Sequence, residues 1–161
     1  MLKHGDILVC RRNSFLSRLI RRFTKSEWSH TALFIEVWGK PCIIEMQSKG
    51  VELIPLEDWK EKWSYEFIAF RSRDSFDYKE MAKKALSVVG RKVKYDYFTF
   101  IFRIPYKLAT SKYRYKGEEI ETRRMICSQL TGWIRNLPDW HRMTPETQYR
   151  YLRDNWKLVE L

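Results

Sequence analysis

The chain has 161 residues, of which 44% are hydrophobic and 16% aromatic. Length and composition predict one globular domain over residues 1–161 and exclude an intrinsically disordered protein. The formal net charge of +11 favours anionic partners such as nucleic acid, phospholipid headgroups or cell-wall polymers, without choosing among them. No apolar run is long enough to span a membrane and no signal peptide is visible, so we expect a cytoplasmic protein.

Hydrophobic periodicity predicts strands and helices that alternate along the chain. In chain order we expect a strand at 6–11, a helix at 14–23, strands at 29–37, 41–47 and 51–54, a helix at 55–63, a strand at 65–71, a helix at 77–89 that ends at Gly90, a helix at 125–137, a helix from Thr144 and a closing strand at 156–161. Residues 95–104 resist assignment, and the charged stretch 107–124 is expected to be a long loop. The fold class is therefore α+β, with one mostly antiparallel central sheet and helices packed on one side of it.

The helix expected at 14–23 is basic and amphipathic. Its apolar residues recur at helical spacing from Phe15 to Phe23, and Arg18, Arg21 and Arg22 lie elsewhere on its surface. A surface helix that packs its apolar stripe on the core is the commoner interpretation. The alternative is a helix that contacts an anionic membrane surface or an anionic substrate such as a cell-wall polymer.

The three cysteines differ in their surroundings. Cys10 and Cys42 stand inside apolar strands, where cysteine usually serves as a small buried hydrophobe. No CxxC spacing exists, so we expect neither a zinc site nor a disulfide framework, and no metal or cofactor. Cys127 stands where a helix is expected to begin. Backbone N–H groups and the helix dipole there favour a thiolate, and the N–H of Cys127 can serve an oxyanion hole.

A base and an acid are found on the predicted hairpin. His4 and His141 lie near the terminus and in a loop, where exposed polar roles are expected, whereas His30 opens a strand. A histidine at a strand end can present one ring nitrogen to a cleft and the other to a partner. Glu45 is an acid within an apolar strand, where a charge needs a partner.

The hairpin turn decides whether these two residues meet. A loop at 37–40 would place His30 opposite Gln47 and diagonal to Glu45, about 7–8 Å away at the Cα atoms. A tight turn at the last two residues of that loop would instead place Glu45 opposite Phe34, too far from His30. The triad requires the longer loop, which also leaves Gln47 as a rival orienting residue.

Five segments together resemble a known family. They are Gly5-Asp6-Ile7-Leu8, the run from Ser26 to Leu33, Ile43-Ile44-Glu45, Lys94-Tyr95-Asp96 and Ile126-Cys127-Ser128-Gln129-Leu130. Their order, with histidine and acid before cysteine, is similar to that of the permuted NlpC-type papain-like proteins of the YiiX group. Lecithin–retinol acyltransferases share that permuted layout. The resemblance covers nearly the whole chain.

The resemblance implies a cysteine hydrolase with Cys127 as nucleophile, His30 as base and Glu45 as the residue that orients it. The implied reaction is acyl transfer through an acyl-enzyme, on a peptide, an amide or a lipid ester. Five further residues are expected at the oxyanion site or substrate cleft: Trp28, Gln47, Tyr95 (by analogy), Ser128 and Gln129. The family often has Glu where this chain has Gln129, and residues 107–124 look long enough for a lid or specificity loop.

A rival interpretation is a basic binding module without turnover, which would hold lipid, peptide or nucleic acid. The charge permits it, but no nucleic-acid motif is present, so no specific nucleic-acid partner is expected. We expect a monomer.

Overall fold

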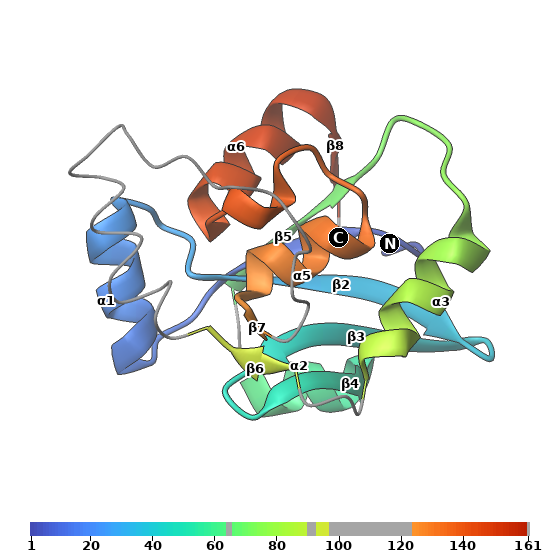
Figure 1. Cartoon of the computed structure of the whole chain (residues 1–161), viewed down its shortest axis with the longest axis horizontal. Coiled ribbons are helices and arrows are strands. Elements are labelled where there is room, and N and C mark those ends of the chain that lie inside the picture. Colours follow the sequence, from blue (N-terminus) through green and yellow to red (C-terminus); the bar gives the residue numbers. More distant parts are fainter. Residues whose placement is uncertain (64–65, 90–92, 97–123, 161) are drawn as a thin grey trace.

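The structure is a computed structural model that describes residues 1–63, 66–89, 93–96 and 124–160. Its centre is a six-stranded antiparallel sheet in the order β4-β3-β2-β1-β5-β8. The prediction of one mostly antiparallel central sheet is confirmed, whereas the strand order was not predicted. A second sheet consists of the short parallel pair β6-β7. Helices lie around the central sheet, with α1 and α3 at opposite ends of the molecule (Figure 1).

The observed elements follow the predicted order closely. The strands are β1 (Ile7–Arg11), β2 (His30–Val37), β3 (Lys40–Gln47), β4 (Gly50–Pro55), β5 (Glu66–Arg71), β6 (Lys94–Tyr95), β7 (Arg124–Met125) and β8 (Lys157–Val159). The helices are α1 (Phe15–Thr24), α2 (Leu56–Trp63), α3 (Tyr78–Val88), α5 (Cys127–Ile134), the short 3₁₀ helix η2 (Trp140–Arg142) and α6 (Pro145–Asn155). Strands β6 and β7 were not predicted, because two-residue strands carry no readable alternation.

The β2–β3 hairpin has the register that the triad needs. Its turn consists of Trp38 and Gly39, both with positive φ (50° and 74°), which matches the right-handed twist of a two-residue hairpin. The connection is therefore shorter than the predicted loop, because Val37 pairs with Lys40. The pairing of Ala32 with Glu45 nevertheless keeps the predicted register.

Both faces of the sheet are covered, which corrects the expectation of helices on one side only. The larger core joins one face to α3, α5 and α6 and includes Leu33, Ile44, Leu130 and Leu152. The opposite face packs against α2 through the buried side chain of Trp59. Sequence periodicity could show that α2 is amphipathic, but the sheet face it covers depends on the chain path after β4.

The start of β1 is tied to β5 by a partly buried ion pair between Asp6 and Arg71. Asp6 is almost fully buried, and Arg71 donates from Nε to Oδ1 at 2.9 Å and from Nη2 to Oδ2 at 2.7 Å. The backbone N–H of Lys3 also donates to Oδ2, at 2.8 Å. A two-pronged guanidinium–carboxylate pair of this kind fixes the strand start geometrically.

Some sequence expectations fall outside the described residues, namely the helix end at Gly90, most of 95–104, and the charged loop at 107–124 except Arg124, which begins β7. Within the described parts, no helix has both the length and the apolar character needed to cross a membrane.

Candidate active site

Cys127 is the first residue of α5, as the sequence predicted for a helix-start cysteine. The side chain of Gln129 accepts a hydrogen bond from the backbone N–H of Ile126 at 3.1 Å and so caps the helix. The N–H groups at the first helical positions have no acceptor inside the helix. These N–H groups and the positive end of the helix dipole lie at the end of α5 that begins with Cys127.

A buried polar contact fixes α5 against β2. The Thr131 hydroxyl lies one turn after Cys127 and is 3.1 Å from the hydroxyl of Thr31. The same hydroxyl donates to Oε1 of Gln148 in α6 at 3.0 Å. These three side chains are fully buried, so they hold the cysteine-bearing helix in register with the strand that carries His30.

His30 begins β2 and lies between the cysteine and an acid. Its Nε2 is 2.7 Å from Oε2 of Glu45, and the Cys127 side chain makes a hydrogen bond with the ring. Because Nε2 is used by Glu45, the remaining nitrogen, Nδ1, is the one available to the sulfur. Glu45 has 0% exposure and Cys127 has 1%.

Two further residues surround the carboxylate of Glu45. Arg12 donates from Nη2 to Glu45 Oε2 at 2.9 Å and from Nη1 to Gln47 Oε1 at 3.2 Å. Gln47 in turn donates from Nε2 to Oε1 of Glu45. The sequence left open whether Glu45 or Gln47 contacts His30. In the structure Glu45 contacts His30, and Gln47 contacts Glu45.

Sequence reasoning missed Arg12. One signal was present: Arg12 follows β1 two residues after Cys10, so strand alternation places both on one face. Cys10 pairs with His30 across the sheet, which brings Arg12 near the site. The ten-residue helix α1 separates β1 from β2 in the sequence, so no local pattern predicts that the two strands pair.

The environment of Glu45 favours its ionised form. Burial alone would raise the pKa of the carboxyl group. The hydrogen bond and charge of His30 oppose this, together with the charge of Arg12 and the hydrogen bond from Gln47, and they hold the pKa of Glu45 at about 2.

The same cluster favours a thiolate–imidazolium pair. Burial raises the pKa of Cys127, but the charge and hydrogen bond of His30, a backbone hydrogen bond from Thr31 and the charge of Arg12 outweigh it, so the pKa is lowered. Burial and Arg12 lower the pKa of His30, whereas the charge and hydrogen bond of Cys127 and the hydrogen bond of Glu45 raise it and prevail. With Arg12 and Glu45 ionised, the four groups sum to zero formal charge. A buried ion pair of this kind is then less costly.

The other predicted cleft residues are placed less uniformly. Tyr95 packs, partly buried, against Ile126. The Trp28 ring contacts the Tyr149 ring in a tilted geometry, with 5.5 Å between ring centroids and 45° between the planes. The Ser128 hydroxyl donates to the Met143 carbonyl oxygen at 2.8 Å, and the Gln129 amide donates to the His141 carbonyl oxygen at 2.8 Å. Ser128 and Gln129 therefore link the start of α5 to the segment around η2, and their place in a substrate cleft stays a prediction.

The remaining cysteines and His4 have structural surroundings. Cys10 and Cys42 are free and buried in the sheet, as predicted, and burial raises the pKa of both thiols. His4 is half-buried rather than exposed, because its Nδ1 accepts a hydrogen bond from the backbone N–H of Glu36 at 2.9 Å. Glu36 lies near the end of β2 remote from His30.

A helix-borne cysteine that meets a strand-borne histidine and acid, with the cysteine last along the chain, has the arrangement of a circularly permuted papain-like protein. Comparison with known families agrees: residues 1–108 match the model of the permuted papain-like amidases of the YaeF/YiiX, C92 family. The chain belongs to this family. The matched range contains His30 and Glu45 and ends before Cys127.

A solved structure shares the fold. The chain resembles the crystal structure of yiiX from Escherichia coli O157:H7, with a TM-score of 0.59 and 22% sequence identity over 82% of this chain. The match spans 63% of the length of that protein, which is described as a metalloprotein. In the described part of the present chain, no three His, Cys, Asp or Glu side chains gather as metal ligands. No curated protein matched the sequence.

Proposed function

We propose that this chain is a thiol hydrolase that cleaves an amide, ester or thioester through an acyl-enzyme on Cys127. The observation that carries the proposal is the contact chain from Cys127 to His30 and from His30 to Glu45. Membership of an amidase family supports the same class of reaction.

In the proposed mechanism, His30 takes the proton of Cys127 and the thiolate attacks the substrate carbonyl carbon. The backbone N–H of Cys127 donates to the oxyanion that forms. His30 then protonates the leaving amine, alcohol or thiol as the C–N, C–O or C–S bond of the substrate breaks, which leaves a thioester on the Cys127 sulfur. Water, deprotonated by His30, attacks that thioester and releases the acid. Glu45 holds the imidazole in the required tautomer throughout.

The near-complete burial of Cys127 favours a second candidate, a module that binds an acyl or peptide ligand without turnover. The two candidates differ in one covalent step. A hydrolase forms and resolves a thioester at Cys127, whereas a binding module leaves the thiol unmodified.

Two measurements test the proposal. The first is the ultraviolet absorbance of the thiolate against pH, taken as the difference between the wild-type protein and Cys127→Ser, because Cys10 and Cys42 are common to both. We expect thiolate to persist well below the free-thiol pKa of about 8.5, and to be lost in His30→Ala. The second is intact-protein mass spectrometry with activated acyl esters. An acyl adduct that forms on wild-type protein and decays, and that is absent in Cys127→Ser, supports the hydrolase. An ordinary thiol titration with no adduct would refute it.

A further inference from the structure

Helix α1 exposes a row of apolar side chains that the core does not use. Phe15 is 75% exposed and Phe23 is 47% exposed, with half-buried Leu19 between them. Residues four apart lie above one another on a helix, so these three form one continuous row. The expectation that the apolar stripe packs on the core is therefore wrong for this side of the helix.

A row of arginines runs beside the apolar row. Arg18 and Arg22 are exposed and also lie four residues apart, whereas Arg21 is half-buried. The segment from Arg11 to Lys25 contains no acidic residue and six basic ones, namely Arg11, Arg12, Arg18, Arg21, Arg22 and Lys25. Arg11 and Arg12 form ion pairs with Glu66 and Glu45. The exposed side of α1 thus combines aromatic side chains with the positive charges of Arg18 and Arg22.

The helix is anchored by its other side. Ile20 is buried against Ile126 and Tyr95, and the buried hydroxyl of Ser17 is 2.8 Å from that of Ser14 at the N-cap. The exposed row is therefore not needed to hold α1 in place. Because Ile126 precedes Cys127, it is the buried side of α1, and not the exposed row, that packs next to the cysteine-bearing helix.

We infer that the exposed side of α1 is a docking surface for an anionic lipid bilayer. Phe15, Leu19 and Phe23 would enter the boundary between headgroups and acyl chains, while Arg18 and Arg22 bind lipid phosphates at the same depth. The phosphates of a nucleic acid could bind the arginines. A nucleic acid has no apolar interior, however, in which a continuous row of apolar side chains could be buried. The inference concerns a surface remote from the thiol chemistry and does not rest on the proposed function.

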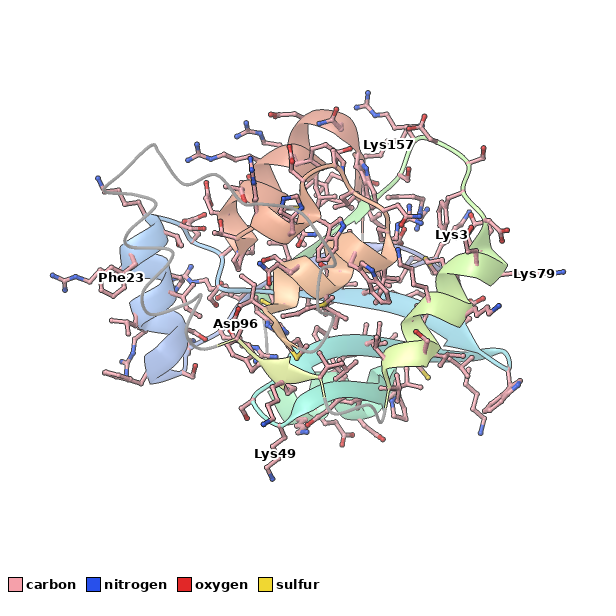
Figure 2. The ribbon with its side chains drawn as sticks, in the orientation of Figure 1. Lys3, Phe23, Lys49, Lys79, Asp96 and Lys157 are labelled. Carbon is pink, nitrogen blue, oxygen red and sulfur yellow. The ribbon has the colours of Figure 1, made fainter. Side chains whose placement is uncertain are left out.

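The test is co-sedimentation of the full chain with vesicles of phosphatidylcholine, alone and mixed with phosphatidylglycerol. Two variants probe the surface: Phe15→Ser with Phe23→Ser, and Arg18→Gln with Arg22→Gln. The matched control is Lys79→Gln with Lys83→Gln, which removes the same charge from exposed positions on α3. Figure 2 shows Lys79 at the opposite end of the molecule from Phe23.

We expect binding to the anionic vesicles, weakened about thirtyfold by loss of the two arginines, since each basic residue near an anionic surface contributes roughly a factor of five. Loss of the two phenylalanines should weaken binding roughly tenfold or more, because their apolar area no longer leaves water. The α3 control should bind as wild type does. Five of the six substituted positions are well exposed, namely Phe15, Arg18, Arg22, Lys79 and Lys83. Phe23 is 47% exposed, and circular dichroism of each variant checks the fold.

Three results would overturn the inference: no binding to anionic vesicles at low salt, equal weakening by the α1 and α3 charge variants, or full binding by the phenylalanine variant. Binding to duplex DNA, measured at the same phosphate concentration as the vesicles, distinguishes a nucleic-acid phosphate from a lipid phosphate as the ligand of the arginines. Tighter binding to DNA than to vesicles, unaffected by the phenylalanine changes, would assign the arginines to nucleic acid. The thiolate titration is independent: an inert thiol with intact vesicle binding refutes only the proposed function.

Discussion

Replacement of Glu45 by Gln tests the electrostatics of the site most directly. The side chain keeps its size but loses its charge against His30 and Arg12. The pKa of Glu45 is about 2 in the folded protein, against an ordinary value of 4.5. Each pKa unit corresponds to about 1.4 kcal/mol, so ionised Glu45 stabilises the fold by about 3 kcal/mol. We expect the variant to lose stability of that order at pH 5 and above.

The pH dependence has a definite sign. A carboxyl group whose pKa is depressed by folding contributes stability above its unfolded pKa, and that contribution falls as pH drops through the folded pKa. The difference between wild type and variant should therefore shrink to about 1.4 kcal/mol at pH 3. Between pH 3 and pH 5, His30 does not change the pH dependence of wild-type stability. Its pKa is raised by folding, so it is protonated in both the folded and the unfolded protein at these pH values.

The assay is urea unfolding of both proteins at pH 5, 4 and 3, with the His30 ring signals followed by NMR in the variant. Glu52→Gln is the matched control, because Glu52 pairs with Glu45 across the sheet but forms a surface ion pair with Lys62. Its loss should cost less than about 1 kcal/mol. A Glu45→Gln difference no larger than that of the control, or one that stays constant down to pH 3 while His30 remains protonated, would refute the reasoning.

Three further predictions concern the site and its frame. Arg12→Gln should move the Cys127 thiolate titration to higher pH. Arg12→Lys should move it less, because lysine keeps the charge but not the two-pronged geometry. Equal titrations in the wild type and both variants would exclude the electrostatic role of Arg12. Arg71→Met should cost about 3 kcal/mol in urea unfolding by leaving Asp6 buried without its cation, and Asp6→Asn added to it should recover part of that loss. Gly132→Ala should cost about 1–3 kcal/mol, because the new Cβ would lie 2.9 Å from Cβ of Trp140; an unchanged unfolding midpoint would contradict this.

Much of the fold could be predicted from local patterns. β-prone runs, with alternation at 65–71, located the strands of the central sheet, and helical spacing, with Thr144 as an N-cap, located the helices. The sequence left two hairpin registers open, and the structure has the one in which Glu45 pairs with Ala32. The turn itself was misjudged: a tryptophan with positive φ is uncommon, so sequence propensity did not favour a two-residue turn at Trp38.

Ser128 and Gln129 follow the cysteine directly, and their side chains donate hydrogen bonds to the carbonyl oxygens of Met143 and His141 around η2. Successive residues on a helix point in directions about a quarter-turn apart or more, so adjacency in sequence does not decide which residues face the same side as Cys127. Their place in a substrate cleft stays a prediction.

The sequence by itself indicated which side chains could do chemistry: one cysteine at a helix start, one histidine at a strand end, and one acid in an apolar strand of the same hairpin. These assignments depend on periods and caps, which are local properties of the chain. Tertiary structure decided the rest, because pairing β1 between β2 and β5 joins segments far apart in sequence. That pairing brings Arg12 onto Glu45. The contact of Thr131 with Thr31 and the exposure of the apolar row of α1 likewise depend on how whole elements pack, which periodicity along the chain does not determine.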